Sequence, residues 1–250
     1  KVGNLFTQSL YTIGANDVFT LNNNKLVFIA RKQGTQGEEL WMYNGTSVSR
    51  VTSNTFIRNP LFFNNKVAFQ TASTMPSPWT VMVYDGTSAL SIGTVSYPGI
   101  ISMNSSGGKL FTIVWNYQEG TATEPTLLYS WTSGSSWTQV KSFTNEGYSS
   151  NLAALGNNLF FLTTSYAGAS NVKMYIIENG TLNVNAIYQN NSAWYGALNY
   201  TVSFSDALYF NLFNSPQEVW KIPASTNVPE NTMNVHPIPQ NMIGIYNLLQ

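Results

Sequence analysis

Short runs of apolar residues alternate with clusters of Asn, Gly and Ser along the whole chain of 250 residues. The runs are rich in β-branched and aromatic residues, and many of them alternate with polar positions. This pattern is typical of β-strands joined by tight turns, whereas a helix would show apolar positions with a period of 3.6 residues. No segment reads convincingly as a helix, so the sequence predicts an all-β protein.

One pattern, a turn of Asn or Gly followed by an apolar strand, recurs five times. The copies align on Leu26, Val67, Leu110, Leu159 and Leu208, at intervals of 41, 43, 49 and 49 residues. Internal repeats of this length are typical of the blades of a β-propeller, each of which is a four-stranded sheet.

Each repeat carries a second landmark, an aromatic strand that runs into a tight turn. The clear copies are Leu40–Thr46, Val81–Thr87 and Met174–Thr181, and the looser ones are Leu128–Gly134 and Val219–Pro223. Asn-Gly and Asp-Gly supply the two positive φ angles of a type I′ turn, which joins antiparallel strands. Each clear landmark is therefore predicted to be the tip of a hairpin.

Together these landmarks predict a single domain over residues 1–250, a five-bladed β-propeller of four-stranded antiparallel blades. The ends of the chain are expected to close the ring. The alternative is a ring of six blades, in which the sixth is built from both termini. The five predicted units span roughly residues 17–53, 60–96, 100–143, 151–188 and 200–238.

The segment Glu39–Thr46, followed by Asn59–Phe69, resembles the ELWxxDGT (hyalin-like) repeats of secreted β-propellers. The second unit resembles them through Val83–Thr87. The spacing agrees over most of the chain, and the motif itself is specific in two or three units. This resemblance implies an extracellular propeller used for binding and adhesion, and it implies no reaction.

Charge is scarce, with eleven basic and eleven acidic residues that make up 9% of the chain. The chain therefore lacks the positive field that binds nucleic acid or anionic membranes, and no nucleic-acid partner is predicted. There is no Cys and one His, His236, so the common zinc sites and thiol catalysis are excluded. No apolar run is long enough to span a bilayer, and neither a metal nor a cofactor is expected.

Uncharged polar residues replace the missing charge, with 30 Asn against 3 Asp. Amides and hydroxyls do not titrate, so such a surface stays polar in acid. The composition resembles that of secreted and virion-surface proteins of acid-dwelling archaea, and an extracellular location is predicted. A start at Lys1 suggests removal of a leader or excision from a longer polypeptide. Five N-x-[ST] sequons are candidate glycosylation sites: Asn44, Asn104, Asn179, Asn190 and Asn199.

Most Trp, Tyr and Phe residues are expected to pack between neighbouring blades, where flat side chains fill the gap. The exceptions are aromatic residues in longer or irregular connections, where they would face solvent and stack on a carbohydrate or a partner. These candidate contact residues are Trp79, Trp115, Tyr117, Trp194 and Tyr195.

A glycoside hydrolase needs two carboxylic acids around its substrate, but Asp17 is the one acidic residue on the predicted inner strands. Glutamates such as Glu146 fall mostly in predicted turns or outer strands, and His236 has no nucleophile motif beside it. The chain is therefore predicted to be no enzyme. The predicted function is an extracellular attachment or decoration domain of a virion or cell-surface filament that contacts glycans or neighbouring proteins. The alternative is a carbohydrate-active enzyme, and a third possibility is a purely structural subunit.

Overall fold

The computed structural model describes most of the chain and leaves out both ends and several connections. The described residues are 11–21, 24–32, 38–52, 56–73, 78–95, 99–115, 126–143, 146–149, 151–165, 172–183, 185–190, 201–212 and 218–234.

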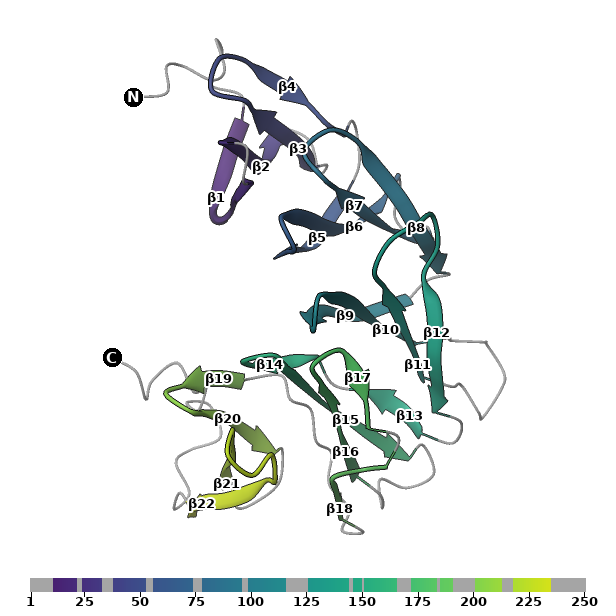
Figure 1. The fold of residues 1–250 in the computed structure, drawn as a ribbon, viewed down its shortest axis with the longest axis vertical. Coiled ribbons are helices and arrows are strands. Elements are labelled where there is room, and N and C mark those ends of the chain that lie inside the picture. The colour runs from purple at the N-terminus through teal and green to yellow at the C-terminus, as the bar shows by residue number, and fades with distance from the viewer. Residues whose placement is uncertain are drawn as a thin grey trace. The chain divides into compact units, whose positions relative to one another are not determined.

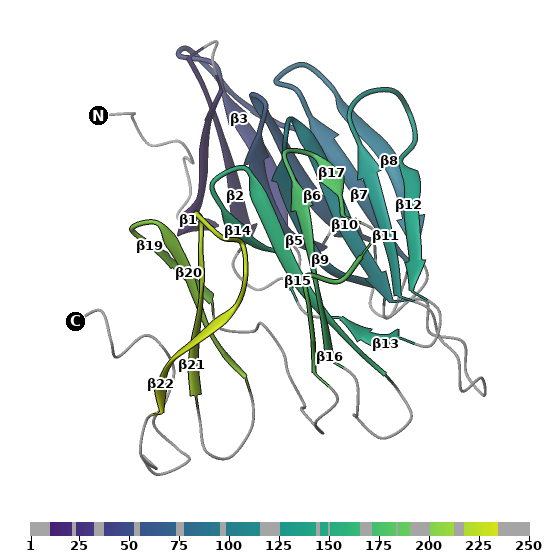
Figure 2. The ribbon, with the colours of Figure 1, turned by 60° about the horizontal axis from the view of Figure 1, so that its bottom comes forward.

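These residues form twenty-two β-strands in five antiparallel sheets (Figures 1 and 2). In four of the sheets each strand pairs with the next one along the chain, which gives a simple four-stranded meander. The all-β prediction is confirmed. No helix among the described residues is long and apolar enough to cross a membrane.

The first compact unit, Lys1–Tyr97 with Ser133–Trp137, contains the first two sheets. Apolar side chains of both sheets form one core, so the two sheets pack against each other. Within each sheet the strands lie side by side in the order in which they occur along the chain. The strands of the first sheet are β1 (Tyr11–Leu21), β2 (Lys25–Lys32), β3 (Glu38–Tyr43) and β4 (Val48–Arg50), and those of the second are β5 (Phe56–Phe63), β6 (Lys66–Ala72), β7 (Trp79–Tyr84) and β8 (Ala89–Val95).

The second unit, Pro98–Thr132 with Thr138–Gln250, contains the other three sheets. The third sheet has β9 (Gly99–Ser106), β10 (Lys109–Trp115), β11 (Thr126–Trp131) and β12 (Thr138–Phe143). The fourth has β13 (Glu146–Ser149), β14 (Ala153–Leu155), β15 (Asn158–Ser165), β16 (Val172–Glu178), β17 (Thr181–Leu182) and β18 (Tyr188–Asn190). The fifth has β19 (Thr201–Phe204), β20 (Ala207–Leu212), β21 (Glu218–Pro223) and β22 (Glu230–Asn234).

The fourth sheet is buried on both faces, which explains its uninterrupted apolar run Leu159–Leu162. Leu159 and Phe161 belong to a core shared with the third sheet, while Phe160 and Leu162 belong to a core shared with the fifth. Successive residues of a strand point to opposite faces, so a strand covered on both sides must be apolar at every position. Aromatic residues fill the core next to the third sheet, where the rings of Phe143 and Phe161 lie 5.6 Å apart.

Both edges of the fourth sheet differ from the prediction of a four-stranded blade over residues 151–188. The structure splits each edge in two, with β13 and β14 on β15, and β17 and β18 on β16. The inner edge is interrupted at Leu152, which bonds to the third sheet instead. Its amide donates to Ser102 Oγ at 3.1 Å, and its carbonyl accepts from Asn104 Nδ2 at 3.0 Å.

The hairpin tips lie where the sequence predicts them, but not all of them adopt the predicted type I′ turn. Asn179 and Gly180 both have positive φ, as a type I′ turn requires. At Asn44–Gly45 and Asp85–Gly86 only the glycine does, because these loops are longer than two residues. There the Asn44 and Asp85 side chains accept hydrogen bonds from backbone amides two and three residues further on, which closes the loop locally.

A lysine at the start of the second strand holds the hairpin tip of the next sheet. In the first unit, Lys25 Nζ donates to the carbonyl of Gly86 at 2.5 Å. In the second unit, Lys109 Nζ donates in the same way to the carbonyl of Gly180 at 3.1 Å. The two landmarks of the sequence repeat therefore meet each other across neighbouring sheets.

The prediction of one domain over residues 1–250 requires that the terminal segments close the ring. Both segments lie outside the described residues, so the closure of the ring and the number of blades stay predictions. Within the described part, β1 and β5 start earlier than the predicted units, at Tyr11 and Phe56.

Candidate functional site

A groove with a volume of about 390 Å³ opens between the first and second sheets, inside the first unit. Pockets for small ligands commonly have volumes of about 300–1,000 Å³, so the groove is large enough for a short polar chain. Its lining residues are Lys25, Met42, Ser49, Arg50, Val51, Tyr84, Gly86, Thr87 and Ala89.

The two walls of the groove are the same part of two successive repeats. Met42 and Ser49–Val51 come from the β3–β4 hairpin, while Tyr84 and Gly86–Ala89 come from the β7–β8 hairpin. Hydrogen bonds to Asn44 and Asp85 fix the loops at the tips of these hairpins. Hydrogen bonds within the two hairpin tips therefore hold the backbone of both groove walls in place.

The charged side chains in the lining are both basic. Lys25 is oriented by its bond to Gly86. Arg50 Nη1 lies 3.4 Å from Oε1 of Glu39, whose side chain is almost buried, while half of the Arg50 side chain is exposed. No carboxylate is among the groove's lining residues. The groove thus offers positive charge above an apolar floor of Met42, Val51 and Ala89.

The tyrosine and the aspartate next to the groove stay in fixed protonation states. Hydrogen bonds from the amides of Ser88 and Thr87 hold the pKa of Asp85 below its usual value, so this carboxylate is an anion. Burial, and then the negative charge of Asp85, raise the pKa of Tyr84 above its usual value, so Tyr84 is a neutral hydroxyl. Asp85 is directed at its own turn, and Lys66 adds a compensating positive charge.

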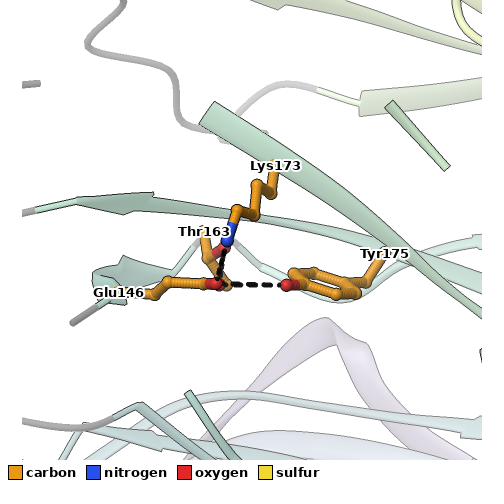
Figure 3. A network of polar contacts seen from close by, with 4 residues as sticks. All are labelled: Glu146, Thr163, Lys173 and Tyr175. Atoms are coloured by element: carbon orange, nitrogen blue, oxygen red, sulfur yellow. Dashed lines mark hydrogen bonds and ion pairs between the residues drawn. The ribbon is translucent and has the colours of Figure 1, made fainter. Parts of the chain in front are cut away.

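A second polar cluster lies on the fourth sheet around Glu146, the first residue of β13 (Figure 3). Lys173 Nζ lies 2.7 Å from Oε1 of Glu146, and the Tyr175 hydroxyl lies 3.2 Å from both carboxylate oxygens. The hydroxyl of Thr163 donates to Oε2. Two strands, β15 and β16, therefore contribute donors to one carboxylate, which anchors the inner strand β13 to the rest of the sheet.

The surroundings of this cluster favour a structural role. Burial, and then the charge of Glu146, raise the pKa of Tyr175 well above its usual value, so the phenol stays a hydrogen-bond donor. Lys141 lies over the rings of Phe143 and Tyr175, at 4.9 and 4.8 Å from their centroids. The carboxylate oxygens of Glu146 are engaged by donors, which leaves this group poorly suited to act as a base or nucleophile.

The Glu146 cluster was missed in the sequence because Glu146 was assigned to a turn or outer strand. A usable signal was the alternation of Lys173 and Tyr175, which places both side chains on one face of a strand. Among the residues that the structure describes, no group of three or more His, Cys, Asp or Glu residues is placed to hold a metal ion.

The predicted aromatic contact residues are placed very differently. Trp79 was expected in a solvent-facing connection, but it is the first residue of β7 and only 2% exposed. The Arg58 guanidinium covers it at 4.8 Å from the ring centroid. Trp115 ends β10 and is half-buried. Tyr117, Trp194 and Tyr195 lie outside the described residues, so their role stays a prediction.

The sequons also differ in their surroundings. Asn44 and Asn179 lie in exposed hairpin turns. Asn104 lies in β9, where Nδ2, the atom that would carry a glycan, donates to the carbonyl of Leu152. Asn190 ends β18, and Asn199 lies outside the described part. Glycosylation stays a prediction, with two of the five sites on open turns.

The chain matches no family model and no curated protein. It is similar in fold to solved structures of prolyl endopeptidases, with a TM-score of 0.58 and 12% identity over 89% of this chain and 35% of theirs. For prolyl oligopeptidase B from Galerina marginata the TM-score is 0.59, with 10% identity over 92% and 38%. For the β-propeller domain of the Trilobed protease from Pyrococcus furiosus it is 0.52, with 11% identity over 82% and 67%.

These likenesses establish the fold class, an all-β propeller, and at such low identity they establish no reaction. The chain spans about a third of the length of the prolyl endopeptidases that it matches. The resemblance to hyalin-like repeats and to archaeal surface proteins stays a prediction.

One prediction is wrong. The chain was predicted to be no enzyme because its sequence shows no catalytic constellation. The structures of similar fold belong to enzymes, in which the matched part makes up 35–38% of the chain. A chain of this fold can thus be part of an enzyme, so the inference from missing catalytic residues to a protein without activity fails.

Proposed function

We propose that this protein is an extracellular recognition module whose groove between the first and second sheets binds a glycan on a surface or on a neighbouring protein. The observation that carries the proposal is the groove itself, with its volume of about 390 Å³ and its walls built from two repeated hairpins. In this role the protein would attach to, or decorate, a virion or a cell-surface filament.

The lining of the groove suits a saccharide. Ser49 and Thr87 bring hydroxyl groups, and Lys25 and Arg50 bring charged donors, all of which suit the hydroxyls of a sugar. The apolar floor matches the C–H faces of a sugar ring. The lining thus combines a larger polar surface with a smaller apolar one, and its oriented polar groups would fix the position of a ligand.

An extracellular location is supported by the composition. With 9% charged residues and 30 Asn, the surface relies on groups whose hydrogen bonding does not change with pH. The sequons on the exposed turns at Asn44 and Asn179 agree with passage through a glycosylating compartment.

The test is a titration of the ¹⁵N-labelled protein with a panel of oligosaccharides, followed by NMR. Ligands are expected to shift the amide signals of Val51, Thr87 and Ala89. The variant Ser49→Trp, which fills the groove from an exposed rim position, should abolish these shifts. The control Ser133→Trp places the same ring on an exposed turn away from the groove lining and should leave them unchanged. Equal binding by the Ser49→Trp variant would refute the site.

A second candidate function comes from the comparisons. In the prolyl endopeptidases of similar fold, inter-domain dynamics have a role in catalysis and specificity. By analogy, this chain would select peptide substrates for a catalytic domain. Proline-containing peptides in the same NMR titration test this candidate, which predicts shifts with the peptides and none with the oligosaccharides.

A further inference from the structure

We infer that the groove of the first unit is selective for an acidic oligosaccharide, one that carries a carboxylate on its sugar ring. This inference rests on the proposed function, because it specifies the ligand of the same groove. It starts from the charge of the lining, in which Lys25 and Arg50 are the charged side chains and both are positive.

Arg50 is the residue placed to bind the carboxylate. Its contact to Glu39 joins one guanidinium nitrogen to one carboxylate oxygen, at the long distance of 3.4 Å, and half of its side chain is exposed. A guanidinium carries five N–H donors and pairs best with a carboxylate through two parallel bonds. Arg50 therefore keeps donors for a ligand while Glu39 holds it at the groove.

Lys25, from the first sheet, brings a positive charge to the hairpin tip of the second sheet. Its ammonium donates to the Gly86 carbonyl, which carries no formal charge, so the positive charge is not neutralised by this bond. The nearby anion Asp85 faces its own turn, where it accepts hydrogen bonds from Thr87 and Ser88 at 2.8 and 2.9 Å. The side chains that line the groove thus carry two positive charges and no negative one, which favours an anionic ligand.

The backbone around the groove favours a saccharide over an extended acidic peptide. A peptide that adds to a sheet needs a long free strand edge, but β4, the outer strand next to the groove, has three residues. The amides of Thr87 and Ser88 are already bonded to Asp85, and that of Ser47 to Asn44. The side-chain donors of Lys25 and Arg50 suit a carboxylate, and the hydroxyls of Ser49 and Thr87 suit those of a sugar.

The test compares three probes of similar length by isothermal titration calorimetry: trigalacturonic acid, neutral maltotriose and a tetraglutamate peptide. Trigalacturonic acid is expected to bind about tenfold or more tightly than maltotriose, and less tightly in high salt. Arg50→Gln should remove this preference, and Arg50→Lys should keep part of it. The control Lys221→Gln removes a half-buried cation of the second unit that does not line the groove, and it should change nothing.

Each outcome decides the question. If maltotriose binds as tightly as trigalacturonic acid, and Ser49→Trp blocks both, the recognition groove stands and the acidic selectivity is refuted. If tetraglutamate binds best, the ligand is a peptide and the inference is refuted. If Arg50→Gln folds normally by NMR and keeps the full preference for the acidic probe, the role of Arg50 is refuted. If no saccharide binds, the proposed function fails together with this inference.

Discussion

Replacing Gly107 by alanine is expected to disrupt the joint between the third and fourth sheets. Gly107 lies in the turn between β9 and β10 with φ of 53°. A β-carbon at this position would lie 2.3 Å from the carbonyl carbon and oxygen of Asn179. Both atoms belong to the backbone of the β16–β17 turn, so an alanine can be accommodated only if this hairpin moves away.

The expected cost has two parts. A left-handed conformation costs an L-residue about 1–2 kcal/mol. Movement of the hairpin would also break two bonds at Gly180, whose amide donates to Ser106 Oγ at 2.9 Å and whose carbonyl accepts from Lys109 at 3.1 Å. At about 1 kcal/mol for each bond, the total becomes about 3–4 kcal/mol.

The chain contains a matched control for this experiment. Gly156 lies in the corresponding turn of the fourth sheet with φ of 58°, and a β-carbon there would meet nothing within 4 Å. Gly156→Ala should therefore show the backbone cost alone, about 1–2 kcal/mol. Equilibrium unfolding in urea measures both variants. If Gly107→Ala is no more destabilising than Gly156→Ala, the close contact between the two turns is refuted.

Three further substitutions, one of them with a control variant, test other parts of the structure. Gly93→Ala would place a β-carbon 2.0 Å from the Trp137 ring, and the strain should lower stability by about 1–3 kcal/mol in urea unfolding. Glu146→Gln removes the charge that its lysine, tyrosine and threonine partners bind and should cost about 1–3 kcal/mol, whereas Glu230→Gln, in an exposed ion pair, should cost at most about 1 kcal/mol. Because the pKa of Asp85 is lowered in the folded protein, its contribution is present above the ordinary pKa of an aspartate and is lost as pH falls through the lowered value. Asp85→Asn should therefore flatten the loss of stability in acid, and an unchanged pH profile of the melting temperature would contradict this.

The sequence was a good guide to the strands and a poor one to the sites. Strand period, turn residues and the repeat are local properties, so the hairpins around Gly86 and Gly180 were predicted in the right places. The groove is not local, because it forms only when two hairpins about forty residues apart pack beside each other. Its two cations, Lys25 and Arg50, come from different strands of the first sheet.

The errors at Glu146 and Trp79 have particular physical causes. The Glu146 cluster depends on a register shift between Glu146 and Tyr148 in their pairing with β15, which no sequence pattern reveals. Trp79 was expected in a longer or irregular connection. It starts β7, pairs with Val95 and is covered by Arg58 from β5, so tertiary packing decides its burial.

The contacts between neighbouring sheets bear on how the protein would respond to acid. Lys25 and Lys109 donate to backbone carbonyls, which do not titrate. The equivalent position at the start of β15 is Asn158, whose side-chain amide lies 3.4 Å from Oδ1 of Asn227. Asn227 also donates to Oε1 of Glu178 at 3.1 Å, so the joint between the fourth and fifth sheets includes a carboxylate. Protonation of carboxylates in acid therefore leaves the two lysine contacts intact, whereas it weakens the contact of Asn227 with Glu178. In this chain of few charges, Lys25 and Lys109 therefore connect neighbouring repeats through backbone carbonyls and need no acidic partner.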